Sequence, residues 1–248
     1  MPAQIGAKSS LENKLSLPPG FRPVTLREVG DAFAHAKAHA AELGAGTLVF
    51  VGRFDLSEFA VVLEPDEPLA IARRAFYAGM CALADTLAAH APPEKPIEFV
   101  WPDAILVDGG VVGGGQFAWS DGPEDQPPQW MVFGAMIRTV AMSDRGLQPL
   151  ASTLEDEGFG ALEVGALAES FTRHLMTAVD RWQEHGFDAI AKDYLARVTS
   201  EKGVGRHLAE NGDLLVRRMA ATDVERTELH AALTAKPSWF HPETRGPR

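Results

Sequence analysis

Apolar residues recur every three or four positions in several stretches of the chain, and this spacing predicts amphipathic helices. The first clear stripe consists of Leu69, Ala72, Phe76, Met80, Leu83 and Leu87 and ends before Pro92 and Pro93. A second stripe, within 163–185, consists of Val164, Leu167, Phe171, Leu175, Val179 and Trp182. Two further helices are predicted over 31–43, which is rich in alanine, and over 188–198.

The predicted ends of these helices carry capping signals. Thr25 and Glu28 have the T-x-x-E spacing of a capping box, and Gly44 is placed to end the first helix. Asp66 is a suitable N-cap for the helix that follows, which has a proline in its first turn. Gly186 is expected to end the helix over 163–185.

Runs of β-branched or apolar residues bounded by Gly, Pro and Asp predict strands. These runs cover 47–51, 58–63, 97–101, 104–107, 111–120 and 130–141. Asp108-Gly109-Gly110 has the composition of a tight turn between two of them. Because the strands are clustered and the helices bracket them, the order favours an α+β fold with a mixed, largely antiparallel sheet flanked by helices.

The length of 248 residues is compatible with one large domain and a small appendage. Residues 1–20 lack periodicity and contain Ser, Pro and Gly, so we expect a flexible lead-in there. The main domain is predicted over 21–198. Residues 199–248 are expected to form a small β appendage and tail, with a turn at Glu210-Asn211-Gly212 before a strand over 213–219.

Composition narrows the class of protein. Apolar residues make up 46% and charged residues 23%, as in soluble globular proteins, and no apolar run approaches the roughly 20 residues of a membrane helix. A net charge of −11 argues against sequence-independent binding of nucleic acid. The start has no secretory signal pattern, and the single cysteine cannot form an intrachain disulfide. We therefore expect a cytoplasmic protein with no membrane or nucleic-acid partner.

Two isolated candidates for chemistry are weak. His35 and His39 are four residues apart, but the glutamate of an H-E-x-x-H motif is absent, so we interpret them as part of a solvated helix face and expect no metal site. Cys81 lies on the apolar stripe of its helix, where a thiol behaves as a small buried hydrophobe. No G-x-S-x-G turn supports a serine nucleophile.

The triplet Gly113, Gly114 and Gly115 is more informative, because glycine weakens a strand unless something approaches its backbone closely. Neither a P-loop lysine nor a helix follows the triplet, so it is not a phosphate-binding loop. It indicates either the floor of a ligand site or a close crossing of two elements. Trp101 and Asp103, on either side of a proline one hairpin earlier, could project at the mouth of the same cavity.

Five segments, taken in order, resemble the biotin and lipoate protein ligase family. They are I-E-F-V-W-P-D-A-I at 97–105, the hairpin over 108–116, F-G-A-M-I-R at 133–138, L-A-S-T-L-E-D-E-G at 150–158 and R-W-Q-E-H-G-F at 181–187. The likeness extends from about Leu26 to Val198. It implies a fold like that of the class II synthetases.

The chain also departs from the family at positions that carry adenylation chemistry. Val100 and Val111 replace lysines, Asp103-Ala104 replaces an Asn-Asp pair, Arg138 replaces an asparagine, and Gly52-Arg53 is the part of a G-R-G-R motif that remains. By resemblance, the lysine at position 111 would stabilise the acid's carboxylate and the α-phosphate. Its loss removes electrostatic stabilisation of several kcal/mol at order of magnitude.

The resemblance implies a ligase that activates a biotin- or lipoate-like carboxylic acid with ATP and Mg²⁺ and transfers it to a lysine of a biotinyl or lipoyl carrier domain, with no tightly bound cofactor. In this reading Arg53 and Arg138 supply the catalytic charge. The ligand-binding residues are Gly52, Trp101, Asp103, Gly113, Gly114 and Gly115. Two alternatives stay open: a non-catalytic pseudo-ligase that binds a biotin-like or acyl carboxylic acid, and an acyltransferase, which needs a cysteine at the rim of the sheet.

Overall fold

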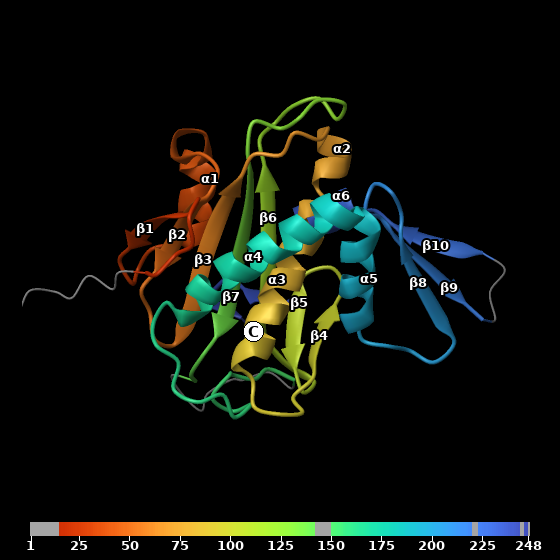
Figure 1. Ribbon diagram of the computed structural model, residues 1–248. Coiled ribbons are helices and arrows are strands. Elements are labelled where there is room, and N and C mark those ends of the chain that lie inside the picture. Colours follow the sequence, from red (N-terminus) through yellow and green to blue (C-terminus); the bar gives the residue numbers. More distant parts are fainter. Residues whose placement is uncertain (1–14, 142–149, 220–222, 244–245, 248) are drawn as a thin grey trace, which may run out of the picture.

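The centre of the computed structural model is a seven-stranded sheet with the strand order β1-β2-β3-β7-β6-β5-β4 (Figure 1). The structure describes residues 15–141, 150–219, 223–243 and 246–247. The strands are β1 (Arg22–Leu26), β2 (Thr47–Val51), β3 (Leu56–Leu63), β4 (Ile97–Val100), β5 (Ala104–Val107), β6 (Gly110–Trp119) and β7 (Met131–Arg138). Only β1 and β2 pair in parallel, which confirms the prediction of a mixed, largely antiparallel sheet.

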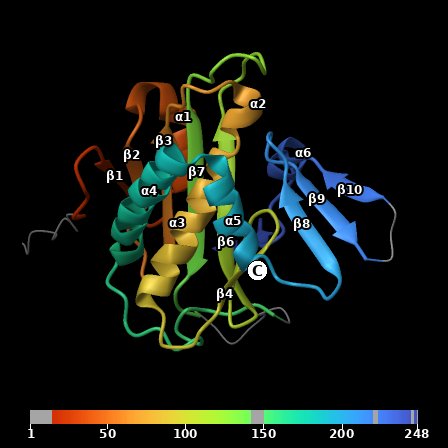
Figure 2. The same cartoon turned by 45° about the vertical axis from the view of Figure 1, so that its right-hand side comes forward.

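Helices cover both faces of this sheet. α3 (Ala75–His90), α4 (Ala166–His185) and α5 (Phe187–Arg197) lie across one face, which we call the helical face (Figures 1 and 2). α1 (Ala32–Leu43) packs on the other, the α1 face, and buries alanines against the valines of β2 and β3. Small side chains on α1 let its backbone approach the sheet closely.

The predicted capping box before α1 is wrong. Thr25 lies in β1, which the sequence pattern missed, and the N-cap of α1 is Asp31. Its Oδ1 accepts a hydrogen bond from the backbone N–H of Ala34 at 2.7 Å. Gly44 ends the helix as predicted, with a φ of 71° that few other residues tolerate.

The helix predicted after Pro65 is divided into α2 (Leu69–Ala72) and α3, with a turn at Arg73 and Arg74. Asp66 is not its N-cap. Instead, the N–H groups of Leu69 and Ala70 donate to the backbone carbonyls of Gln126 and Glu124 at 2.8 and 3.0 Å. The connection before β7 therefore caps α2, which a local pattern could not reveal.

The described part of the last fifty residues includes two small sheets. β8 (Val204–Leu208), β9 (Leu214–Arg218) and β10 (Val224–Thr227) make a three-stranded antiparallel sheet beside α5 (Figure 1). After α6 (Leu229–Thr234) the chain returns to the α1 face of the main sheet, where β11 (Phe240–His241) pairs with β12 (Gly246–Pro247) and β12 contacts β6 and β7. The strand predicted over 213–219 is β9.

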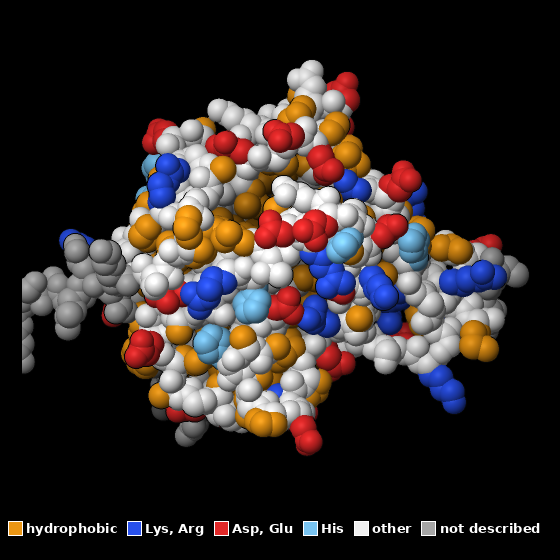
Figure 3. Space-filling model, viewed as in Figure 1, with side chains coloured by type: hydrophobic (Ala, Val, Ile, Leu, Met, Phe, Trp, Pro, Cys, Tyr) orange, Lys and Arg blue, Asp and Glu red, His pale blue; other side chains and the backbone are white. Residues whose placement is uncertain are grey.

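Charges over α4 and α5 are mixed in sign. Figure 3 shows Lys and Arg side chains interspersed with Asp and Glu on this face. Ion pairs link Arg181 to Asp193 at 2.9 Å and Arg197 to Asp85 at 2.5 Å. Among the described residues, no helix is long and apolar enough to cross a membrane.

One tyrosine links the three-stranded sheet to the main domain. Tyr77 is fully buried in α3, and its hydroxyl donates to the carbonyl of Gly212 at 2.6 Å. The same oxygen accepts from the indole Nε1 of Trp101 at 3.0 Å. Burial is the main cause that raises the pKa of Tyr77, so the hydroxyl stays protonated and can donate at neutral pH.

Replacing Tyr77 by Phe should lower the free energy of unfolding by about 1–3 kcal/mol, because the carbonyl of Gly212 and the indole N–H of Trp101 both lose a partner. Tyr194→Phe is the matched control, since its hydroxyl donates one bond, to Pro102 at 2.7 Å. Urea denaturation measures both variants. A smaller loss for Tyr77→Phe than for Tyr194→Phe would contradict this account.

Candidate functional site

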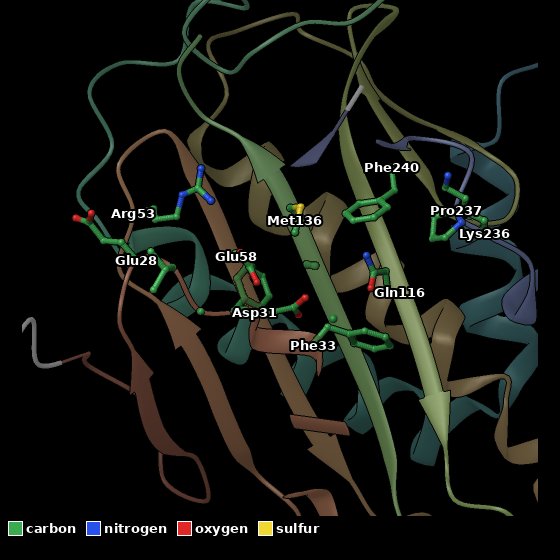
Figure 4. Close-up of a pocket in the computed structure, with 15 residues that line it drawn as sticks. Glu28, Asp31, Phe33, Arg53, Glu58, Gln116, Met136, Lys236, Pro237 and Phe240 are labelled. Atoms are coloured by element: carbon green, nitrogen blue, oxygen red, sulfur yellow. The ribbon is translucent and has the colours of Figure 1, made fainter. Parts of the chain in front are cut away.

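A cavity of about 510 Å³ opens on the α1 face (Figure 4). It lies between the N-terminus of α1, strands β3, β6 and β7, and the C-terminal segment, a name we use for residues 236–243 and 246–247. Met136 and Gly134 from β7 form part of its wall, and Phe33 comes from α1. Figure 4 places Arg53 and Glu28 on one side, with Lys236 and Phe240 on the other. The cavity therefore combines an apolar surface with charged groups of both signs.

Carboxylates gather where α1 begins. Glu58 of β3 is only 3% exposed, and its Oε1 accepts a hydrogen bond from the backbone N–H of Ala32 at 2.7 Å. The partial positive charge at a helix N-terminus favours a carboxylate in this position. Asp31 and Glu28 line the same cavity. This end of the cavity offers hydrogen-bond acceptors to a ligand.

Arg53, predicted to be catalytic, lines the cavity but is already paired. Its Nε and Nη2 donate to the two carboxylate oxygens of Asp55 at 3.0 and 2.6 Å. Hydrogen bonding to Asp55 raises the pKa of Arg53, so the guanidinium stays charged. Gly52 precedes it just beyond the end of β2. The positive charge of Arg53 is largely balanced by its neighbour.

Arg138 lies at the end of β7, and strand alternation places its side chain on the same face as Met136. Its Nη2 donates to the backbone carbonyl of Pro247, while its Nε is buried with no hydrogen-bond partner among the described residues. Burial lowers the pKa of Arg138. The second predicted cation is thus covered by the chain's own C-terminal segment.

Asp103 and Gly115 line a neighbouring cavity of about 440 Å³ between β6 and α6. Phe33, Gln116 and Pro237 contribute to both cavities, so the two are adjacent. Of the residues predicted for one site, the structure therefore brings Arg53, Arg138, Asp103 and the glycine strand to one region of the sheet.

The three glycines lie at close crossings. A Cβ on Gly113, whose φ is 152°, would collide with the carbonyl oxygen of Met136. A Cβ on Gly114 would collide with the carbonyl of Asp103 and the indole of Trp239, whereas one on Gly115 would meet side chains on the helical face. The close-crossing interpretation of the triplet accounts for all three positions, and Trp239 fills the space above Gly114.

Trp101 does not line either cavity. Its indole donates to Tyr77 and packs against the core of the helical face, so the structure gives it a structural contact. Cys81 is also buried in that core, and burial raises the pKa of its thiol to about 12. A thiol of that pKa, away from the rim of the sheet, does not support the acyltransferase alternative. The rings of His35 and His39 stack at 4.4 Å between centroids.

Four residues of this region escaped the sequence analysis: Glu58, Lys236, Trp239 and Phe240. The sequence does contain a signal for Glu58, which lies inside an otherwise apolar strand. Burial of a carboxylate is costly unless the group is hydrogen-bonded, so its position there indicates a specific partner. The other three lie far from the sheet in sequence and reach it only through the fold. Within the described ranges no group of three or more His, Cys, Asp or Glu residues is placed to hold a metal ion.

Asp103 should make the stability of the protein depend on pH. Its side chain is buried, and this burial raises its pKa from 3.8 to about 6, although the hydroxyl of Ser238 donates to it at 3.2 Å. The folded state therefore takes up a proton, and the stabilisation from Asp103 that is present below pH 4 is lost as the pH rises to 6. The loss should approach about 3 kcal/mol relative to Asp103→Asn.

Denaturant unfolding of both proteins at pH 4, 5, 6 and 7 measures this difference. Asp121→Asn, on the exposed rim of the same cavity, is the control for the loss of one carboxylate in this region. A difference between wild type and Asp103→Asn that is the same at every pH would rule out a proton uptake by Asp103.

The sequence model of the biotin/lipoate A/B protein ligase family matches residues 17–196. A biotin protein ligase-like protein of unknown function from Silicibacter sp. TM1040 is 25% identical, with a TM-score of 0.78 over 90% of this chain and 100% of that one. Biotin protein ligase from Aquifex aeolicus gives 13% identity and a TM-score of 0.65 over 84% and 100%. That of Leishmania major, solved with biotinyl-5-AMP, gives 16% and 0.55 over 85% and 99%. No curated protein sequence matches significantly.

Proposed function

The chain belongs to the biotin/lipoate A/B protein ligase family, and from this premise we propose that it binds a small biotin-like carboxylic acid in the cavity beside the N-terminus of α1 without activating that acid with ATP. The observation that carries the proposal is the balance of charge around the cavity. Three carboxylates, from Glu28, Asp31 and Glu58, face two cations, Arg53 and Lys236.

Adenylation needs a surplus of positive charge. A carboxylate that attacks ATP builds up negative charge at the α-phosphate, and removal of one preorganised charge donor typically lowers kcat by about 10²–10³. Arg53 is held by Asp55, Arg138 by the carbonyl of Pro247, and Val111 stands where the resemblance expects a lysine. These residues do not fit a magnesium–triphosphate group, although a solved Aquifex aeolicus relative holds biotin and ATP.

The same groups suit a ligand with N–H donors and an apolar body. The buried carboxylate of Glu58 favours a partner that donates hydrogen bonds, because a charged acceptor strengthens each bond. Met136, Phe33 and Phe240 offer apolar contact, and Lys236 can pair with the carboxylate. A cyclic urea with a carboxylated tail meets these demands, whereas octanoate and lipoate bring no N–H donor to Glu58.

Calorimetric titration should therefore show binding of biotin that is at least about tenfold tighter than that of octanoate or lipoate, which corresponds to about 1.4 kcal/mol. Addition of ATP and Mg²⁺ should leave the biotin affinity unchanged, and no acid should support ATP–pyrophosphate exchange. Exchange with any of the three acids would instead support a ligase that uses Arg53 and Arg138, with a carrier-domain lysine as acceptor.

Glu58→Gln tests which group selects the ligand. The amide oxygen can still accept from Ala32, but it carries no charge, so biotin should bind about tenfold more weakly while octanoate changes little. Glu184→Gln, at the exposed end of α4, is the matched control and should leave the biotin affinity unchanged. An equal loss for both acids in Glu58→Gln would indicate a general disturbance of the cavity rather than recognition of N–H donors.

A further inference from the structure

The C-terminal segment crosses the α1 face of β6 and β7. Its largest buried side chain is that of Trp239, which is 2% exposed. The indole packs in a nest of apolar side chains. These are Leu56, Ala104, Val111, Met136 and Phe240.

Part of this nest coincides with the positions at which the chain departs from its family. Val111 stands where the resemblance places the catalytic lysine, and Ala104 stands in the Asn-Asp pair. A lysine or a carboxylate packed against the indole would lose part of its hydration, which is unfavourable. Val111 and Ala104 therefore have two effects: they remove polar or charged groups that the family uses in adenylation, and they favour docking of the tryptophan.

Backbone and polar contacts fix the segment on both sides of the indole. Gly114 has no side chain, so the ring lies directly against the strand. Ser238 donates to Asp103, and Arg138 donates to the carbonyl of Pro247. Asp103 and Arg138 also stand at positions to which the resemblance assigns adenylation chemistry. The segment thus engages several of these positions at once.

The docked state also contains an unfavourable feature. The indole Nε1 of Trp239 is buried with no hydrogen-bond partner among the described residues, whereas a buried tryptophan N–H usually has one. An unpaired buried donor opposes docking. The unpaired N–H therefore offsets part of the stabilisation that the apolar contacts of the indole provide.

We propose that the described residues of the C-terminal segment, 236–243 and 246–247, are an intramolecular occupant of the nucleotide region of the sheet, with the Trp239 indole in the place of a purine ring. This inference rests on the proposed function, since it supplies a steric reason why the acid is bound but not activated. In the wild-type chain the docked segment excludes nucleoside phosphates. Opening the nest exposes a flat apolar slot beside Arg138, whose guanidinium can then pair with a phosphate.

The test uses the full-length chain with Trp239→Gly. Because a large buried side chain is lost, the Tm should fall by about 5–15 °C, and millimolar indole should restore part of that fall by refilling the nest. AMP should bind this variant at least about tenfold more tightly than it binds the wild type. If Trp239→Gly does not fold even with indole, Trp239→Leu takes its place, with a gain of a few fold expected.

Phe171→Ala is the matched control, because it removes a fully buried aromatic ring from the core of the helical face, away from Trp239. It should not gain affinity for AMP. Equal AMP affinities for the wild type and the Trp239 variant would overturn the inference, and so would AMP binding to a wild-type chain whose segment stays protected from hydrogen exchange. Biotin titration of the wild type separates the two proposals, since absent biotin binding rejects the proposed function whatever AMP does.

Discussion

The contact between the indole of Trp239 and the bare backbone of Gly114 determines how the α1 face of the sheet is used. The ring can lie there only because position 114 has no side chain and because Val111 and Met136 are apolar. With the ring in place, Pro237 lines both cavities, and the Nη2 of Arg138 donates to the backbone carbonyl of Pro247. One long-range contact therefore decides which charges remain available to a ligand.

Two buried carboxylates on this face show how the fold accommodates charge. Glu58 accepts a hydrogen bond from the first turn of α1, where the helix dipole favours a negative group. No ion pair links Asp103 to a cation among the described residues, and burial raises its pKa to about 6 although Ser238 donates to it. A buried carboxylate whose pKa is raised in this way is typical of functional regions rather than of purely structural ones. Both groups lie beside the cavities and not in the core of the helical face.

The sequence pattern predicted the helices and strands whose formation depends on residues close together in the chain. The apolar stripe of α3 lies where its periodicity places it. The continuous apolar runs of β2 and β3 also became strands, because these two strands are buried on both faces of the sheet. β1 was missed because its proline and its short exposed pattern look like a loop, yet it pairs in parallel with β2. α2 was merged with α3 because its cap comes from a connection some fifty residues away. β11 and β12 are too short to have a period.

The same distinction explains the site. A motif fixes where the backbone lies, but the surroundings of a side chain depend on every element that packs against it. Trp101 occupies a family-like strand end, yet its indole turns to Tyr77 on the helical face. Arg53 occupies a family-like loop, but a carboxylate two residues later neutralises it. Asp55 follows Arg53 by two residues, so this pairing is local in sequence, whereas Trp239 lies 125 positions after Gly114 and no spacing rule links them. Family membership therefore constrains where a ligand binds more strongly than it constrains the reaction. Binding requires a cavity and a few complementary groups, whereas adenylation requires uncompensated positive charge at one point.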